Sequence, residues 1–149
     1  MHALDLDGML QRLHLPTVRR LYPDLEPRAE AEDLTYREFL ALLVAEEVAH
    51  RAQTRIERSV RKARFPFLRA IEDFDFTFQT SVRLSLLGSY LGPELVTEGR
   101  SLILSGPSGT GKSHLAVAIA YRAIQNGYDA LFASAAGLIE TLSAAAHKG

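Results

Sequence analysis

The sequence predicts an α+β chain, in which an N-terminal helical domain is followed by the first part of an α/β domain. Residues 36–63 run without Gly or Pro and carry apolar side chains at helical spacing, which predicts one helix of about 28 residues that ends before Pro66. Residues 101–146 then alternate between short apolar segments and helical patterns. We therefore expect three parts, which are a helical domain at 1–64, a linker at 65–99 and a truncated α/β domain at 100–149.

The helical domain begins with apolar residues at helical spacing, which are Leu4, Leu6, Met9, Leu10 and Leu13. Pro16 is expected to end or interrupt this first helix, and Pro23 to stop a short second one. The polar residues 27–33 are typical of a loop. The long helix has a clear start, because Thr35 and Glu38 have the spacing of a capping box.

The linker changes in character. Phe74, Phe76 and Phe78 alternate with polar residues, which predicts a strand or an extended segment. Such rings could stack on nucleic-acid bases, but they more often pack a linker against a core, and we favour the core. Residues 81–90 are expected to form a short helix before the turn at Gly92.

The last part reads as strand, loop, helix, strand and helix. Residues 101–105 form a short apolar segment, and a helix is expected from Gly111 to Gln125, ended by Asn126 and Gly127. A second strand at 130–133 and a second helix at 138–146 complete the pattern.

A glycine-rich loop lies between the first strand and its helix. It fits the pattern G-x-x-x-x-G-K-[ST], in which backbone amides and the helix N-terminus bind phosphate, Lys reaches the β- and γ-phosphates and the hydroxyl suits Mg²⁺. The nucleotide-binding residues that this motif predicts are Gly106, Pro107, Ser108, Gly109, Thr110, Gly111, Lys112, Ser113 and His114, with Ser113 as the Mg²⁺ ligand. The motif therefore predicts binding of a nucleoside triphosphate with Mg²⁺.

Hydrolysis would need an acidic residue at the end of another apolar strand. After Ser113 the only acids are Asp129, which precedes its expected strand, and Glu140, which lies in an expected helix. Neither fits, so no catalytic residue is assigned, and the missing motif is the reason to expect a truncated domain.

Composition excludes several other classes of protein. The chain has 149 residues, a net charge of -1 and no cysteine, which excludes disulfides and thiolate zinc sites. Its first residues are acidic rather than basic and apolar, unlike a signal peptide, and no segment is long and apolar enough to span a membrane. We expect a cytoplasmic protein with no membrane partner.

Residues 51–69 carry seven basic side chains and one acid, a local charge of +6. A basic stripe on a helix is the electrostatic signature of contact with a phosphate backbone. Alternatively, it is a solvated face that pairs with acids such as Glu46 and Glu47 or with a partner subunit. The candidate DNA-binding residues are Arg51, Arg55, Arg58, Arg61, Lys62 and Arg64. No base-reading motif accompanies them, so the predicted contact with double-stranded DNA is independent of sequence.

Three segments together resemble a known family. The run at 63–66, the IEDFDF run at 71–76 and the loop GPSGTGKSHLA are similar to the IstB-like ATP-binding proteins, which are AAA+ ATPases that help insertion-sequence transposases. The helical start and the stretch around Glu46, Glu47 and Arg51 also resemble that family. The resemblance implies ATP as the nucleotide, contact of 65–99 with the adenine side of the site, self-association as an AAA+ oligomer in a full-length protein, and activation of a transposase at target DNA.

Two alternatives remain open at this point. Related helicase loaders share the ATPase core but use their N-terminal part to bind a helicase. A non-enzymatic remnant of a mobile element would also lack the acidic motif. The resemblance further implies an AAA+ sheet in strand order 5-1-4-3-2, in which residues 101–105 and 130–133 would be the first and second strands and would not be neighbours.

Overall fold

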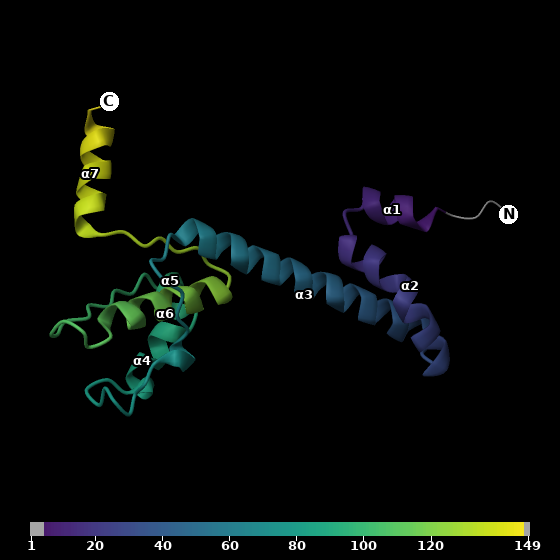
Figure 1. Ribbon diagram of the computed structural model, residues 1–149, viewed down its shortest axis with the longest axis horizontal. Helices are drawn as coiled ribbons and strands as arrows, with labels where there is room; N and C mark the ends of the chain where they lie inside the picture. Colours follow the sequence, from purple (N-terminus) through teal and green to yellow (C-terminus); the bar gives the residue numbers. More distant parts are fainter. Residues whose placement is uncertain (1–4, 148–149) are drawn as a thin grey trace. The chain divides into compact units, whose positions relative to one another are not determined.

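The computed structural model describes residues 5–147 of the chain. It divides into two compact units, Met1–Arg55 and Ile56–Gly149. The α-helices of each unit are labelled in Figure 1. The expected three-part division at residues 64 and 99 remains a prediction.

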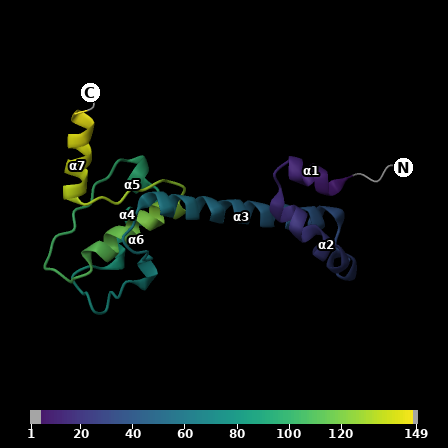
Figure 2. The same ribbon diagram turned by 45° about the horizontal axis from the view of Figure 1, so that its top comes forward.

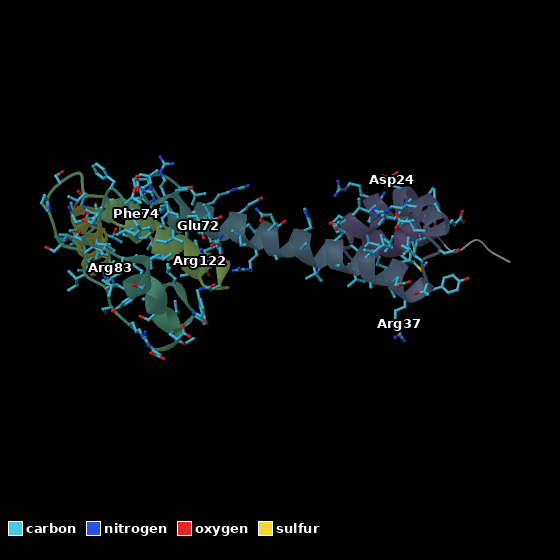
Figure 3. All side chains as sticks on the ribbon, turned by 90° about the horizontal axis from the view of Figure 1, so that it is seen from below. Asp24, Arg37, Glu72, Phe74, Arg83 and Arg122 are labelled. Atoms are coloured by element: carbon cyan, nitrogen blue, oxygen red, sulfur yellow. The ribbon has the colours of Figure 1, made fainter. Side chains whose placement is uncertain are left out.

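The first unit contains α1 (Leu6–Arg12), α2 (Pro16–Ala31) and the first part of α3 (Tyr36–Ala63). Its small core consists of Leu10, Val18 and Leu43, one from each helix, and further apolar side chains of α2 and α3 pack around them. Figures 1 and 2 both show α2 beside the first part of α3 and α1 next to α2. Charged side chains such as Asp24 and Arg37 lie at the surface (Figure 3). The predicted helix around Leu4 lies in part outside the described residues.

The long helix begins and ends as the sequence predicts. The amide of Thr35 donates to the carboxylate of Glu38 at 2.8 Å, and the amide of Glu38 donates to the hydroxyl of Thr35 at 3.3 Å. These two bonds are the reciprocal pair of a capping box, so that prediction is confirmed. The helix runs for 28 residues and ends before Pro66.

The second helix differs from the prediction. α2 runs for 16 residues through Pro23 and Pro27, where we expected a stop and a loop. Each proline removes one backbone donor and disfavours a helix interior. The helix continues because Leu21, Tyr22 and Leu25 on this same stretch pack on the core of the unit, and this burial outweighs the local cost of the two prolines.

The second unit contains the end of α3 and five shorter elements: the 3₁₀ turn η1 (Ile71–Asp73), α4 (Leu84–Leu91), α5 (Glu94–Thr97), α6 (Lys112–Gln125) and α7 (Ala135–Ala146). Its core joins η1, α4 and α6 through the buried residues Ile71, Phe74, Leu87, Leu115, Ala118 and Ile119. Helix α6 is the centre of the unit, since Ile124 and Val117 on it are almost completely buried. Its predicted end is confirmed at Gln125.

The α+β prediction is wrong for the part of the chain that the structure describes. Residues 5–147 contain helices and turns but no strand. Residues 101–105 alternate between exposed and half-buried, as expected of an extended segment, with Leu102 and Leu104 packed on the core. A strand also needs a neighbour that supplies a ladder of hydrogen bonds. No described segment forms such a ladder with residues 101–105 or 130–133, and the amide of Phe132 makes a single backbone bond, to Ala63. The apolar pattern was therefore sufficient for an extended backbone but not for a sheet.

The phenylalanine-rich segment also forms no strand. The carboxylate of Asp75 accepts from the amides of Thr77 and Phe78, at 2.9 and 3.1 Å, and closes a turn. Hydrogen bonds from the hydroxyl of Thr77 and from these amides lower the pKa of Asp75. This local bonding by a short acidic side chain competes with strand pairing, and the alternating pattern did not reveal it.

Two contacts tie the end of α3 to the segment after α6. The buried Ser59 hydroxyl donates to Asp129 at 2.7 Å, and the amide of Phe132 donates to the carbonyl of Ala63 at 2.8 Å. The second bond satisfies one of the carbonyls that a helix C-terminus leaves without an internal partner. Across residues 5–147, no helix has the length and apolar character needed to cross a membrane.

Candidate nucleotide-binding site

The predicted phosphate loop forms a continuous turn before α6. Gly109 and Gly111 have φ angles of 79° and 89°, which L side chains rarely adopt, so both positions favour glycine. Gly111 is the residue that precedes α6, and Lys112 and Ser113 begin the helix. The loop therefore lies at a helix N-terminus, where free amides and the helix dipole favour an anion.

Lys112 and Ser113, whose side chains could bind phosphate and Mg²⁺, both lie at the start of α6. Lys112 donates to the carbonyl of Pro107 within its own loop, and the Thr110 hydroxyl donates to the same carbonyl at 2.8 Å. Ser113 is exposed on the first turn of α6, and that turn contains no acidic residue. The start of α6 is therefore positively charged through Lys112, and the hydroxyl of Ser113 is on the adjacent residue.

The linker packs against this loop at three points. A β-carbon on Gly111 would lie 2.7 Å from Cε2 of Phe74, so the ring sits directly on the loop. His114 stacks edge-on against the same ring, with a centroid distance of 5.2 Å, and its Nε2 lies 3.4 Å from the carbonyl of Ala70. The side-chain amide of Gln79 donates to the carbonyl of Thr110 at 3.3 Å.

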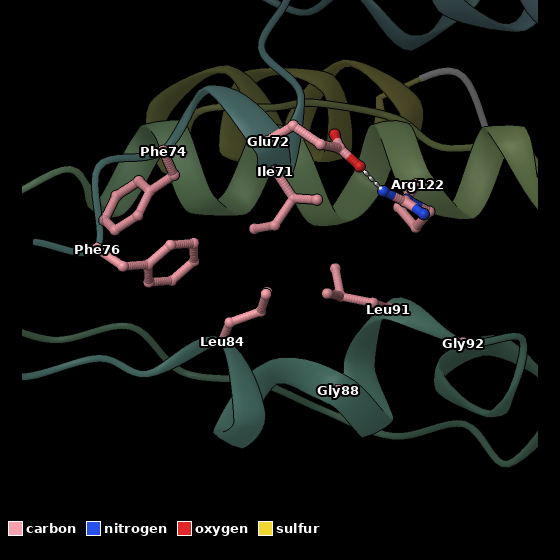
Figure 4. Close-up of a pocket in the computed structure, with 9 residues that line it drawn as sticks. All are labelled: Ile71, Glu72, Phe74, Phe76, Leu84, Gly88, Leu91, Gly92 and Arg122. Carbon is pink, nitrogen blue, oxygen red and sulfur yellow. Dashed lines mark hydrogen bonds and ion pairs between the residues drawn. The ribbon is translucent and has the colours of Figure 1, made fainter.

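An open apolar pocket of about 570 Å³ lies along α6 on the other side of Phe74. Figure 4 shows its two walls, with η1 and α6 on one side and α4 on the other. Ile71, Phe74 and Phe76 line it from the linker, and the Glu72–Arg122 ion pair lies at its edge. This ion pair ties η1 to α6, and the pocket shares the Phe74 ring with the phosphate loop.

The two acids after the loop have no place in the site. Asp129 is held by the hydroxyl of Ser59, and Glu140 is exposed on α7. Within residues 5–147, no group of three His, Cys, Asp or Glu side chains is arranged to hold a metal ion. The assignment of Ser113 to Mg²⁺ remains a prediction from the loop motif.

The structure gives the candidate DNA-binding residues different surroundings. Arg58, Arg61, Lys62 and Arg64 are exposed near the end of α3, and Arg55 is half-buried. Arg51 is engaged in the first unit, since it donates to the Glu47 carboxylate at 3.1 Å and to the His14 carbonyl at 2.6 Å. Arg64 lies just beyond the last residue of α3, and the other five lie on the helix. For Arg51 the alternative of pairing with Glu47 is confirmed, whereas helical spacing could not show its bond to the His14 carbonyl.

The sequence alone did not indicate which linker residues contact the loop. The sequence indicates no role for Gln79 or Ala70, and it predicts core packing for Phe74, with base stacking as the alternative. The core position of Phe74 is confirmed. The alternating phenylalanines predicted a strand in this segment, so the turn closed by Asp75 was not recognised. Contacts across some 30 to 40 residues of sequence, such as Gln79 with Thr110, leave no periodic trace.

Comparison with known proteins gives several relatives. The chain is 34% identical over 142 residues to a Pseudomonas aeruginosa protein provisionally named as the ATP-binding protein of insertion sequence IS21, which covers 95% of this chain and 53% of that protein. It is 35% identical over 138 residues to a provisionally named insertion-sequence ATP-binding protein of Sinorhizobium fredii, covering 92% of this chain and 46% of the relative. A third, of Geobacillus stearothermophilus and insertion sequence IS5376, is 30% identical over 138 residues, with coverage of 93% and 55%.

The chain thus spans about half the length of these curated relatives. Residues 8–149 match the family model described as IstB-like ATP binding protein, and the chain belongs to that family.

Proposed function

We propose that this chain binds ATP together with Mg²⁺ at residues 106–113, as part of a DNA-associated helper of insertion-sequence transposition. The observation that carries the proposal is the loop itself. Its glycines adopt positive φ at the start of α6, and Lys112 and Ser113 lie at that start. Membership of the ATP-binding family and the names of the relatives support ATP over other anions.

Lys112 is the cation of this site. In the proposed complex its ammonium group leaves the Pro107 carbonyl and binds the β- and γ-phosphates, while the N–H groups of the loop donate hydrogen bonds to the remaining phosphate oxygens. Lys112→Ala should weaken ATP binding about tenfold or more, equivalent to a loss of one charge-assisted hydrogen bond. Titration of a fluorescent ATP analogue with Mg²⁺ measures this, and Arg83→Ala, an exposed cation of the same unit, is the matched control. Equal affinity of wild type and Lys112→Ala would reject the site.

Ser113 is the proposed Mg²⁺ ligand. Its hydroxyl is a hard oxygen donor on the first turn of α6, close to where the phosphates would lie. Ser113→Ala should remove most of the increase in ATP affinity that Mg²⁺ gives, while the affinity without Mg²⁺ changes little. Ser101→Ala, outside the loop, serves as the control. An undiminished Mg²⁺ effect in Ser113→Ala would assign the metal to the phosphates alone.

The basic face of α3 is the proposed surface for double-stranded DNA. Exposed Arg58 and Lys62 recur at helical spacing with Arg55, and phosphate contacts of this kind do not depend on base sequence. Reversal of these three charges to Glu should weaken binding equally for unrelated duplexes and reduce the salt dependence by about three phosphate contacts. A triple reversal of Arg20, Arg37 and Arg83 changes the net charge equally at other exposed positions. Equal losses in the two variants would mean that only net charge matters.

The proposed protein partner is a transposase, and the proposed assembly is an oligomer of the full-length protein. The support is the association of the relatives' names with insertion sequences. A pull-down with the purified transposase of the same element, in parallel with a replicative helicase, tests this choice. Retention of the helicase but not the transposase would overturn it.

A further inference from the structure

One peptide group of the phosphate loop is held from outside the loop. The Nε2 group of Gln79 donates to the carbonyl of Thr110, 31 residues further along the chain, at 3.3 Å. Both residues are half-buried and line a small cleft of about 210 Å³ together with Lys112. This bond thus lies beside the cation of the proposed site.

The bond fixes the direction of a loop amide. In a trans peptide the C=O and N–H groups are coplanar and point in opposite directions, so a carbonyl held by Gln79 aims the N–H of Gly111 the opposite way. Gly111 is followed directly by α6 and has a φ of 89°. Because glycine has access to many backbone conformations, this peptide group would turn easily without an external hold.

Gln79 is itself oriented by its neighbours. The Ser81 hydroxyl donates to Oε1 of Gln79 at 2.9 Å, which leaves the NH₂ group facing Thr110. The backbone amide of Gln79 donates to the carbonyl of Asp75 at 3.1 Å, within the turn that the Asp75 carboxylate closes. Side chain and backbone are therefore both placed before any ligand arrives, as a positioning residue requires.

We propose that Gln79 is a positioning residue for the triphosphate, acting through the peptide group between Thr110 and Gly111. It does not touch the nucleotide in this role. It keeps the Gly111 amide aimed at the phosphates, and Ser81 acts only by orienting Gln79. This inference rests on the proposed ATP site at residues 106–113.

The test compares ligands with and without phosphate. Gln79→Met keeps the length of the side chain but removes the donor. Competition against a fluorescent ATP analogue should show that both ATP and pyrophosphate bind about three- to tenfold more weakly to Gln79→Met than to wild type, which is the effect of one oriented hydrogen bond. Adenosine should bind equally to both, and the unfolding midpoint without nucleotide should not move.

Ser81→Ala gives an independent variant at an exposed position. It should weaken pyrophosphate binding by a smaller factor, and Gln79→Met with Ser81→Ala should be no weaker than Gln79→Met alone, because the two residues act in one chain. The comparison of the two single variants with the double variant also tests the positioning role if Gln79→Met is less stable than wild type. Unchanged pyrophosphate affinity in Gln79→Met and Ser81→Ala, or additive losses, would overturn the positioning role alone. A wild-type chain that binds neither ATP nor pyrophosphate would overturn the proposed function and this inference with it.

Discussion

The two units of the chain use polar groups in opposite ways. In residues 5–55 a carboxylate is part of the interior, since Glu47 is 4% exposed and accepts from the amides of Thr17 and Val18 at the start of α2. In residues 56–147 the interior is mainly apolar, and the polar loop at 106–113 is largely exposed. The first unit thus uses a buried charge to hold helices together, while the second leaves its charged chemistry accessible to a ligand.

Both units leave apolar side chains uncovered, but they differ in where these lie. In the first unit they include Tyr36 and Leu40 on α3. In the second unit Ile103 is 90% exposed and Leu131 is 72% exposed, both in extended segments without a paired neighbour. Its packing is concentrated in α6, where Ile124 has no exposed surface. Stability in this unit should therefore depend on a few positions, and the following substitutions test that comparison.

The largest effect is expected at the centre of α6. Ile124→Ala should destabilise the second unit by about 2–5 kcal/mol, because it removes transfer energy and leaves a cavity. Leu43→Ala is the counterpart in the first unit, where Leu43 is 5% exposed. Denaturation followed by circular dichroism gives the total loss, and hydrogen exchange shows where it falls. Ile124→Ala should speed exchange in α6, and Leu43→Ala in α1 and α2. If either variant speeds exchange equally in both units, the units unfold together.

The buried carboxylate gives the next effect. Glu47→Gln keeps the shape but loses the charge that two amides and Arg51 share, and it should cost about 1–3 kcal/mol. Glu46→Gln is the matched control, because Glu46 is adjacent and exposed; it should change stability by less than about 0.5 kcal/mol. Urea denaturation measures both. Equal small effects would mean that the carboxylate is replaceable by any acceptor.

The same residue predicts a pH dependence. Burial raises the pKa of Glu47, but hydrogen bonds from Val18, Arg51 and Thr17 outweigh it and the net pKa is lowered. A lowered pKa means that the stabilisation is present above the unfolded-state value of about 4.3 and is lost as the pH falls through the folded value. Urea midpoints between pH 7 and pH 3 should fall less steeply for Glu47→Gln than for wild type. Parallel curves would assign the acid sensitivity to other carboxylates, such as Glu38 and Asp75, whose pKa values are also lowered.

A smaller effect is expected at the start of α3. Thr35→Ala removes the hydroxyl that accepts from the Glu38 amide and should cost about 1 kcal/mol. Thr35→Ser keeps the oxygen and should be close to wild type. Thermal denaturation of the two variants separates the capping hydrogen bond from the loss of a methyl group. Equal destabilisation would show that the capping bond contributes nothing measurable.

The smallest effect is expected where the second unit is least packed. Ile103→Thr should change stability by less than about 0.5 kcal/mol, because the side chain is almost fully exposed. Leu104→Ala, at the next position of the same segment, should cost more because Leu104 is half-buried and packs against the core. A large loss of stability from Ile103→Thr would mean that this side chain is covered in the folded chain, and that the second unit does not depend on only a few packed positions.

Some features of this chain follow from local sequence. The start of α3 follows from Thr35 and Glu38, and its end from Pro66. The G-x-x-x-x-G-K-S run locates the phosphate loop and the start of α6. Capping, proline geometry and glycine conformation all act over a few residues, so local sequence is sufficient for these features. The resemblance of the linker and the loop to the family also lay in the sequence and is confirmed by the match over residues 8–149.

Tertiary structure decided the rest. Packing on Leu10 and Leu43 carried α2 through its prolines, and the lack of a hydrogen-bonding neighbour left residues 101–105 extended without a sheet. Arg51 reached the His14 carbonyl, and Gln79 reached Thr110, because the fold brought together groups that are distant in sequence. Local patterns set which conformations a segment prefers, but the free energy of long-range burial and hydrogen bonding selects among them, and that energy depends on which neighbours the fold supplies.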